Sequence, residues 1–563
     1  MTGLADEARR QAGAAAAAGD PLQAFRLLEA AARQRGSDAP LWNSAGNAAM
    51  RAGQVEDAAA AFGRAVDADP ASLEYAINHA IALGRCGRDQ AAIDALVHHA
   101  AAGARDARYC SVRAARALAL GQRAEAARWY DAALAAEPGH ARATLGRARV
   151  ALERAEPDAV EQFERAIAAQ PGDRERWLGK AQALEADARF AEAAEVAAAL
   201  TAQMPGWIDA LRFETALLLK AGDPDCTRPF AAAEAALPGD PAIAAAHVEA
   251  LGALDRFGAA ADRAAAARTR FPAIPEFAML EAQHAGAAGD DARAELIWRE
   301  LPLRSTERDL LEARHRLRVG QPDAAVRLLN RVREADHANV TAWALLGVAW
   351  RLLDDPRAGW LHEQPGLVAM LPLHGWTELR EEVTALLHQL HDAAAPPLGQ
   401  SLRGGTQTRG GLFDRMEQPF VRLADTIDAT LEDYRAQLPA ADAAHPLLRH
   451  RDAPWRIAGS WSVRLAGGGD HHTAHIHPFG ILSSALYAEI PPPALDQDPE
   501  AGWLEVGRPA ADLRLDLPPL HVIRPVPGDL ALFPSTLFHG TRPFSGGRRM
   551  TVAFDVHTGG ATA

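Results

Sequence analysis

Prolines recur along the first half of this 563-residue chain at a nearly constant spacing, each after a run with a helical pattern. They are Pro70, Pro138, Pro171, Pro205, Pro238 and Pro272, with gaps of 68, 33, 34, 33 and 34 residues. A period of 34 residues is typical of α-solenoids, in which pairs of antiparallel helices stack on one another. The chain also exceeds the roughly 250 to 300 residues that one hydrophobic core supports, so we expect at least two domains.

The segment before Pro70 indicates which kind of repeat is present. Its large and small residues follow the order of a tetratricopeptide repeat, at Trp42, Gly46, Gly53, Ala58, Phe62 and Ala65. Small residues let two helices approach closely, and large ones fill the space between neighbouring hairpins. The same order returns before Pro138 and Pro171 and again at Trp343. This part resembles the tetratricopeptide repeat family, with about nine or ten units before Leu353.

The resemblance implies a partner for the array. Tetratricopeptide arrays form superhelices whose concave face, built from the first helix of each hairpin, accepts an extended peptide or another protein. We therefore expect a protein or peptide partner. The alternative is that the array only scaffolds or oligomerises the rest of the chain, since its first helices are mostly Ala, Arg and Glu without an evident clamp.

Charge and composition exclude other partners. The chain has 59 Lys and Arg against 73 Asp and Glu, a net charge of −14, so we expect no nucleic-acid partner. Cys86, Cys110 and Cys226 form neither a disulfide framework nor a zinc motif, which favours a reducing compartment. No secretory signal and no long apolar run is evident, so we expect a cytoplasmic protein without membrane contact.

The repeat period ends after Leu353, and the residues that follow predict a connector. A helical pattern runs from 376 to 393, and an amphipathic one from 419 to 438 could cover the outer face of a sheet. Between them, residues 397–411 are rich in Gly and polar side chains and predict a loop. This loop could close over an active site or offer Arg403 to an anionic substrate, and the alternative is a flexible linker. The predicted domains are a repeat solenoid at 1–353, a helical connector at 354–440 and a β domain at 441–563.

From Trp455 the pattern changes to short β-rich runs separated by Gly and Pro. These runs are Trp461 to Leu465, Ile481 to Ile490, Trp503 to Val506, His521 to Arg524, Leu530 to Phe533 and Met550 to Val556. Strands at such spacing predict a jelly roll or barrel. His475 and His477 would lie on the same side of a strand, because side chains alternate with a period of two. His539 follows at the end of a later strand, and Arg549 comes ten residues after it.

This order of residues, from Trp461 through Pro525–Ser535 to Phe554, resembles a family of Fe(II)/2-oxoglutarate-dependent oxygenases that is fused to tetratricopeptide arrays in bacteria. The resemblance implies a double-stranded β-helix (jelly-roll) catalytic domain, and so a multidomain α + β protein. It also implies Fe(2+) as the metal, 2-oxoglutarate and O2 as cosubstrates, and hydroxylation of a C–H bond as the reaction.

The resemblance implies that His475, His477 and His539 hold the iron. Such sites typically use two imidazoles and one carboxylate, and this chain has His477 where the superfamily pattern has Asp. His477 is then either a third imidazole ligand, which we favour, or a neighbour of an iron held by two residues and water. Asp470 is a remote candidate for a carboxylate ligand, because it precedes the motif.

Arg549 is predicted to bind the distal carboxylate of 2-oxoglutarate, because a guanidinium donates two parallel hydrogen bonds to a carboxylate. Thr551 would point the same way on the strand and add a third bond, whereas Arg548 would face the other side. Tyr487 is a weaker candidate for the same carboxylate, with core packing as its alternative role.

The predicted function is hydroxylation of a protein or peptide recruited by the repeats. One alternative is a small-molecule hydroxylase with the repeats as a scaffold. Another is a cupin-like dioxygenase that needs no 2-oxoglutarate. The third is a non-catalytic tetratricopeptide adaptor with a decayed cupin-like pocket.

Overall fold

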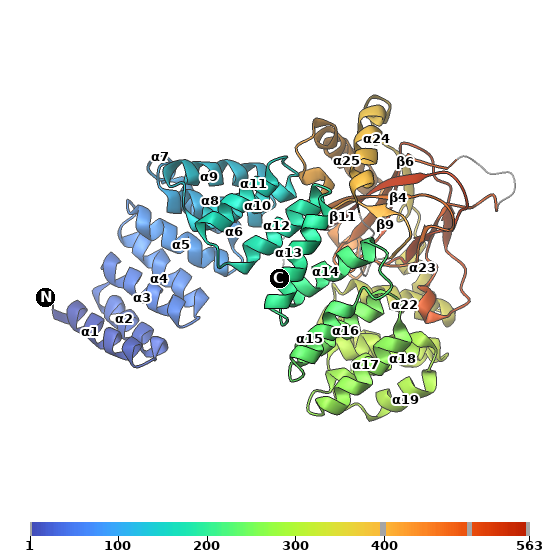
Figure 1. Ribbon diagram of the computed structural model, residues 1–563, viewed down its shortest axis with the longest axis horizontal. Coiled ribbons are helices and arrows are strands. Elements are labelled where there is room, and N and C mark those ends of the chain that lie inside the picture. The colour runs from blue at the N-terminus through green and yellow to red at the C-terminus, as the bar shows by residue number, and fades with distance from the viewer. Residues whose placement is uncertain (1–2, 395–400, 492–497, 559–563) are drawn as a thin grey trace. The chain divides into compact units, whose positions relative to one another are not determined.

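The computed structural model describes residues 3–394, 401–491 and 498–558 (Figure 1). By their internal contacts the residues form two compact units, one within Met1–Ala183 and one within Leu184–Gly559. Residues 397–400 of the predicted polar loop lie outside the described ranges. Of the helices within those ranges, none is long and apolar enough to cross a lipid bilayer.

The first unit consists of helical hairpins. Several of its helices begin at an Asp or Ser whose side chain accepts a backbone N–H of the first turn, as at Asp38, Ser72 and Asp106. The helices are α1 (Gly3–Ala17), α2 (Pro21–Arg35), α3 (Ala39–Arg51), α4 (Val55–Ala68), α5 (Leu73–Arg85), α6 (Asp89–Val97), α7 (Ala100–Gly103), α8 (Ala107–Ala119), α9 (Arg123–Ala136), α10 (Ala141–Glu153), α11 (Ala159–Ala169) and most of α12 (Arg174–Ala186).

Glycines in this unit let an aromatic ring of a neighbouring helix approach the backbone. A Cβ atom added at Gly46 would lie only 2.6 Å from the ring of Phe62, so a larger residue there would push the two helices apart. The same kind of contact joins Gly146 to Tyr130 and Gly179 to Phe163. These contacts are the close helix packing that the tetratricopeptide pattern predicts.

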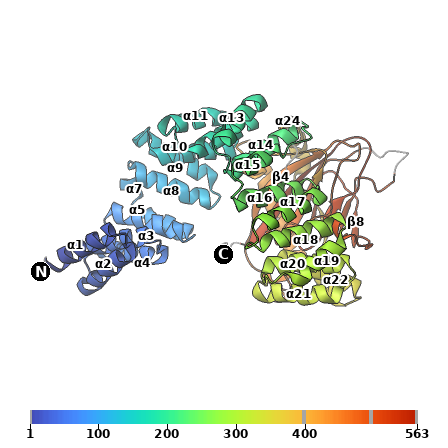
Figure 2. The ribbon, with the colours of Figure 1, turned by 60° about the horizontal axis from the view of Figure 1, so that its bottom comes forward.

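The second unit begins with further hairpins, which Figure 2 shows stacked in order. Their first helices are α14 (Ile208–Lys220), α16 (Pro241–Ala253), α18 (Glu276–Ala288), α20 (Thr306–Arg318) and α22 (Val340–Leu352). Their other helices are α13 (Phe190–Gln203), α15 (Arg228–Ala236), α17 (Phe257–Arg270), α19 (Asp291–Glu300), α21 (Pro322–Ala335) and α23 (Arg357–His362).

The same unit contains an antiparallel β domain. Its main sheet has the order β1 (Ala369–Pro372), β9 (Asp529–Pro534), β6 (Leu482–Glu489), β11 (Arg549–Thr558), β4 (Trp455–Leu465) and β3 (Thr406–Gln407). A smaller sheet has the order β10 (His539–Thr541), β7 (Leu504–Val506) and β8 (His521–Ile523), and β2 (Leu402–Arg403) pairs with β5 (His471–His472). Short 3-10 turns are η1 (Leu412–Asp414), η2 (Leu448–His450) and η3 (Ala511–Leu513). The fold class predicted from the sequence, a tetratricopeptide solenoid followed by a jelly-roll-type β domain, is confirmed.

The two faces of the main sheet have different partners, because side chains alternate along a strand. Met550, Val552, Phe554 and Val556 of β11 form one core with α24 (Trp376–Ala393) and α25 (Gln418–Gln437), which cover that face (Figure 1). On the opposite face, Tyr487 and Phe533 pack with residues of the smaller sheet. Arg549, Thr551 and Asp555 alternate with the core residues of β11 and so point toward this second face.

The segment predicted as a connector takes part in the β domain. It supplies β1, which pairs with β9, and β2 and β3, which lie in the predicted polar loop and pair with β5 and β4. Thr408 adds side-chain and backbone hydrogen bonds to Ser462 of β4. The domain boundaries at 353 and 440 stay predictions.

The last repeats share a core with the β domain. Trp343, Trp350 and neighbouring residues of α20 to α22 form one buried cluster with Leu513 and Phe538. Asp512 of η3 accepts hydrogen bonds from Arg314 (2.5 Å) and Arg318 (2.6 Å) of α20. These helices therefore support the β domain directly.

Candidate metal and cosubstrate site

Three imidazoles converge on the second face of the main sheet. One nitrogen from each of His475, His477 and His539 lies within 4.8 Å of the others, and His475 Nε2 is 3.1 Å from His477 Nε2. His539 is buried, and the two others are half-buried. The structure therefore brings together the three histidines predicted as metal ligands, and the cluster could hold a metal ion.

Backbone pairing sets this arrangement. His475 and His539 exchange two backbone hydrogen bonds, 3.0 Å and 2.9 Å long, which place their side chains next to each other. A Cβ atom at Gly540 would lie 2.8 Å from the carbonyl oxygen of His472, so glycine after His539 allows the strands this close approach. The His-Gly order in the sequence thus serves the site.

Each ring has an oxygen acceptor at its Nδ1 atom. These acceptors are the carbonyl oxygens of Thr473 for His475 (2.9 Å) and of Leu537 for His539 (3.2 Å), and Asp555 Oδ1 for His477 (2.5 Å). An acceptor at Nδ1 favours the tautomer with its proton on that atom, which leaves the lone pair of Nε2 for a metal. The three rings are therefore oriented as a ligand set.

Two of the imidazoles, those of His475 and His539, also have the protonation state that a metal needs. Burial, aided by the neighbouring His477, lowers the pKa of His475 to about 3. Burial and the neighbouring histidines hold the pKa of His539 well below its usual value. Neutral imidazoles keep the lone pair that binds a divalent ion.

Asp555 is a site residue that our sequence interpretation missed. It lies on β11 six residues after Arg549, so the alternation that places Arg549 and Thr551 on one face also places Asp555 there. That signal could have identified it. The remote candidate Asp470 instead accepts the backbone N–H of Ala466 at 2.9 Å and is not part of the histidine cluster.

Asp555→Ala is expected to weaken metal binding by about 10- to 100-fold, because His477 loses the acceptor that orients its ring. Asp555→Asn should weaken it less, since the amide oxygen can still accept the Nδ1 proton. Anaerobic calorimetric titration with Mn(II) measures both. Asp529→Asn, on strand β9 of the same sheet, is the control. Equal affinity of Asp555→Ala and wild type would show that His477 needs no such support.

A buried arginine lies on the same face. Arg549 is 2% exposed, and its guanidinium carbon is 5.2 Å from the centre of the Tyr487 ring. Its Nε has no hydrogen-bond partner, and among the described residues no carboxylate pairs with it. Burial lowers its pKa. A buried guanidinium without a counter-ion is costly, so this position suits an anionic ligand.

Thr551 and Tyr487 are direct neighbours of this arginine. They are partners in the pairing of β11 with β6, and both are buried. Burial raises the pKa of Tyr487, so its hydroxyl stays protonated and can donate a hydrogen bond. Arg548, in contrast, is exposed and lies near Glu489. The residues present thus fit an anion such as 2-oxoglutarate beside a metal.

An antiparallel β sandwich with convergent imidazoles and a buried arginine on one inner face has the fold of a jelly-roll oxygenase, and its imidazole cluster could hold a metal ion. Residues 459–555 match the family described as "Putative 2OG-Fe(II) oxygenase". Tetratricopeptide repeats are matched at 9–72, 43–107, 157–206 and 310–356. The chain therefore carries a C-terminal domain of the 2OG-Fe(II) oxygenase family after N-terminal tetratricopeptide repeats.

Several solved structures are similar to parts of the helical array. The match with a crystal structure of MamA has 20% sequence identity and a TM-score of 0.28, and it covers 31% of this chain and 96% of the MamA chain. The match with PilF of Pseudomonas aeruginosa has 20% sequence identity and a TM-score of 0.31, and it covers 37% of this chain and 95% of the PilF chain. YrrB is described as a tetratricopeptide protein with an unusual peptide-binding site. The match with it has 18% sequence identity and a TM-score of 0.27, and it covers 30% of this chain and 88% of the YrrB chain. No curated protein matches the chain.

Proposed function

We propose that this protein is an Fe(II)- and 2-oxoglutarate-dependent oxygenase that hydroxylates a C–H bond of a protein or peptide substrate. His475, His477 and His539 would hold the iron, and Arg549 with Thr551 and Tyr487 would bind the distal carboxylate of 2-oxoglutarate. When bound, iron and 2-oxoglutarate supply the activation of dioxygen. The protein residues hold the metal, orient the cosubstrate and neutralise its charge.

The observation that carries this proposal is that the imidazole cluster shares one face of the sheet with a buried arginine to which no described residue supplies a counter-ion. A cupin-like dioxygenase that uses no 2-oxoglutarate would not need this arginine. A decayed adaptor pocket would not be expected to keep an oxygen acceptor at each of the three imidazoles.

A protein substrate is supported by the position of the repeats. Helices α18, α20 and α22, the first helices of their hairpins, line a cleft together with Thr473 and Ala474, which directly precede His475. A polypeptide on the concave side of these hairpins would therefore reach the metal-binding segment. A volume of about 720 Å³ also fits a small molecule, which keeps a small-molecule hydroxylase as the second candidate.

Anaerobic titration of the iron-loaded protein with 2-oxoglutarate tests the proposal. We expect the visible charge-transfer band of the iron chelate in the wild type. In Arg549→Ala the affinity should fall by about 100-fold, because two hydrogen bonds between charged groups are lost. Arg548→Ala removes the exposed neighbour instead and should leave the titration unchanged.

No band in the wild type, despite bound iron, would exclude 2-oxoglutarate as the cosubstrate. A band that is equally strong in Arg549→Ala would show that another residue binds the distal carboxylate. Succinate release with candidate peptides and with small molecules then separates the two substrate classes.

A further inference from the structure

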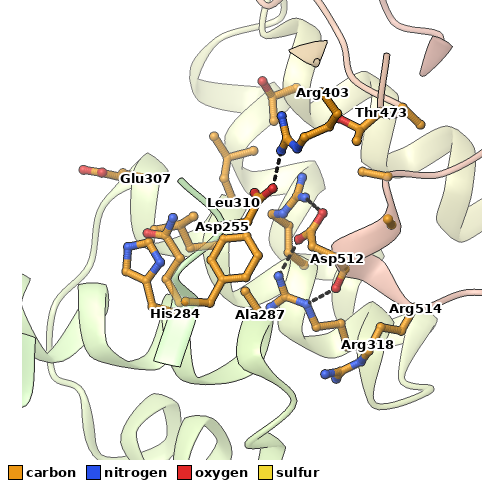
Figure 3. A pocket seen from close by; sticks show the side chains of 18 residues that line it. Asp255, His284, Ala287, Glu307, Leu310, Arg318, Arg403, Thr473, Asp512 and Arg514 are labelled. Atoms are coloured by element: carbon orange, nitrogen blue, oxygen red, sulfur yellow. Dashed lines mark hydrogen bonds and ion pairs between the residues drawn. The ribbon is translucent and has the colours of Figure 1, made fainter. Parts of the chain in front are cut away.

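The cleft between the repeats and the β domain has one wall from each (Figure 3). The helical wall consists of Gln283, His284 and Ala287 of α18, Glu307, Leu310, Leu311, Arg314 and Arg318 of α20, and Thr341 of α22, with Asp255 and Phe257 at the start of α17. The β-domain wall consists of Arg403, Thr473, Ala474, Ala510, Ala511, Asp512 and Arg514. The cleft thus crosses four successive hairpins, as an extended ligand requires.

The β-domain wall is continuous with the metal centre. Ala474 is the residue before His475, and neighbouring Cα atoms are about 3.8 Å apart. The carbonyl oxygen of Thr473 also accepts the Nδ1 proton of His475. A ligand in the cleft therefore contacts the backbone that orients a metal ligand.

Positive charge is concentrated at the end of this cleft beside Asp512. Arg403 is paired with Asp255 (2.6 Å), and Arg514 with Asp291 (2.6 Å). Arg314 and Arg318 share the single carboxylate of Asp512. Figure 3 shows Glu307, the remaining acidic residue of the wall, apart from Asp512. One positive charge beside Asp512 is therefore not neutralised by the residues around it.

Of the two arginines that share Asp512, Arg314 is the one that a ligand can reach. Its side chain is 22% exposed, against 3% for Arg318. Its ion pair with Asp512 joins Nη2 to Oδ1, whereas Arg318 also donates to the backbone oxygen of Asp512. A guanidinium has five N–H donors, so Arg314 can keep Asp512 and bind a second carboxylate. Leu310 and Phe257 add apolar surface to the same cleft.

We propose that this cleft binds the substrate polypeptide and recognises an acidic side chain near the oxidised residue through Arg314. The inference rests on the proposed function for the chemistry that follows binding. It adds the class of substrate, an extended segment that contains Asp or Glu. The net charge of the chain, −14, repels an acidic ligand at long range. Binding must therefore come from local contacts in the cleft.

Fluorescence anisotropy on the metal-free full-length protein tests this inference. The probes are a short fluorescein-labelled peptide of alternating glutamate and alanine, and a glutamine–alanine peptide of the same length. We expect tighter binding of the glutamate peptide. Arg314→Gln should weaken its binding by roughly tenfold, since a charge-assisted hydrogen bond is lost. Glu307→Gln should strengthen it by about twofold to threefold, because a like charge is removed.

Arg327→Gln is the matched control, because Arg327 lies exposed on α21, a second helix that does not line the cleft. It should leave the affinity unchanged. Equal affinity for the two peptides would overturn the inference, and so would an equal loss in Arg314→Gln and Arg327→Gln. Displacement of the glutamate peptide by free L-glutamate at matched carboxylate concentration would indicate that the ligand is a small acid. It would overturn the inference that the cleft binds a polypeptide.

The test separates the two proposals because it uses neither iron nor 2-oxoglutarate. If the glutamate peptide binds through Arg314 but no chelate band forms, the inference about the cleft is supported and the proposed oxygenase chemistry is contradicted. If the chelate band forms but the glutamate peptide does not bind, the proposed chemistry is supported and the inference of an acidic substrate is contradicted.

Discussion

Asp512→Ala is expected to lower the free energy of unfolding of the second unit by about 3 to 5 kcal/mol, the usual effect of leaving a buried charge without its partner. Asp512 accepts hydrogen bonds from Arg314 and Arg318, and the Arg318 side chain is only 3% exposed. These two arginines lower the pKa of Asp512 despite its burial, which shows that the charged form is the stable one in the folded protein.

Urea denaturation followed by tryptophan fluorescence measures this loss, because Trp343 and Trp350 lie in the core that joins α22 to the β domain. Asp516→Ala is the control, since Asp516 is exposed four residues further along the same loop. Asp512→Asn should cost less than alanine, because the amide oxygen still accepts one hydrogen bond. A loss below about 1 kcal/mol in Asp512→Ala would contradict a structural role for this carboxylate.

Lowering the pH from 7 to 5 is expected to destabilise the protein by about 4 kcal/mol through two buried histidines. Burial lowers the pKa of both His362 and His391 to about 3. Between this value and the unfolded pKa of about 6.5 the unfolded chain binds more protons than the folded one, so stability falls as the pH falls. Each histidine contributes about 2 kcal/mol at pH 5, at roughly 1.4 kcal/mol for each pH unit below 6.5.

The contacts of these histidines explain why they stay neutral. His391 Nε2 lies 2.9 Å from Ser462 Oγ, which itself donates to the carbonyl oxygen of Thr551, so the ring is the donor at Nε2. Its Nδ1, 2.9 Å from Thr406 Oγ1, is then the acceptor, and protonation would remove that hydrogen bond. His362 Nε2 lies 3.1 Å from Thr536 Oγ1 in a buried position.

Urea midpoints measured at several pH values test this expectation. His362→Gln keeps a polar group near Thr536 without titrating in this range, so it should reduce the loss of stability between pH 7 and 5 by about 2 kcal/mol. His98→Gln, at an exposed position on the helical array, should leave the dependence unchanged. A wild-type midpoint that is constant from pH 7 to 5 would contradict the neutral state of both histidines.

Much of the architecture was predictable because it depends on local patterns. The proline period and the small residues at Gly46 and its equivalents define helices that pack on their sequence neighbours, so the repeat class follows from the sequence. The alternation of strand residues likewise predicted that Arg549 and Thr551 share one face and that Arg548 lies on the other, as the structure shows. Their role in binding 2-oxoglutarate stays a prediction.

The sequence by itself determined the two domain types and the order of the imidazoles and the arginine. The strand predicted for His475 and His477 was wrong, because the structure has only an isolated β-bridge at His475. Only the tertiary structure decided that Asp555 supports His477, that Asp512 joins two arginines of α20, and that Thr408 pairs the polar loop with β4. These contacts join residues 54 to 198 positions apart. No local periodicity specifies such partners, because their burial and hydrogen bonding depend on how the whole chain packs.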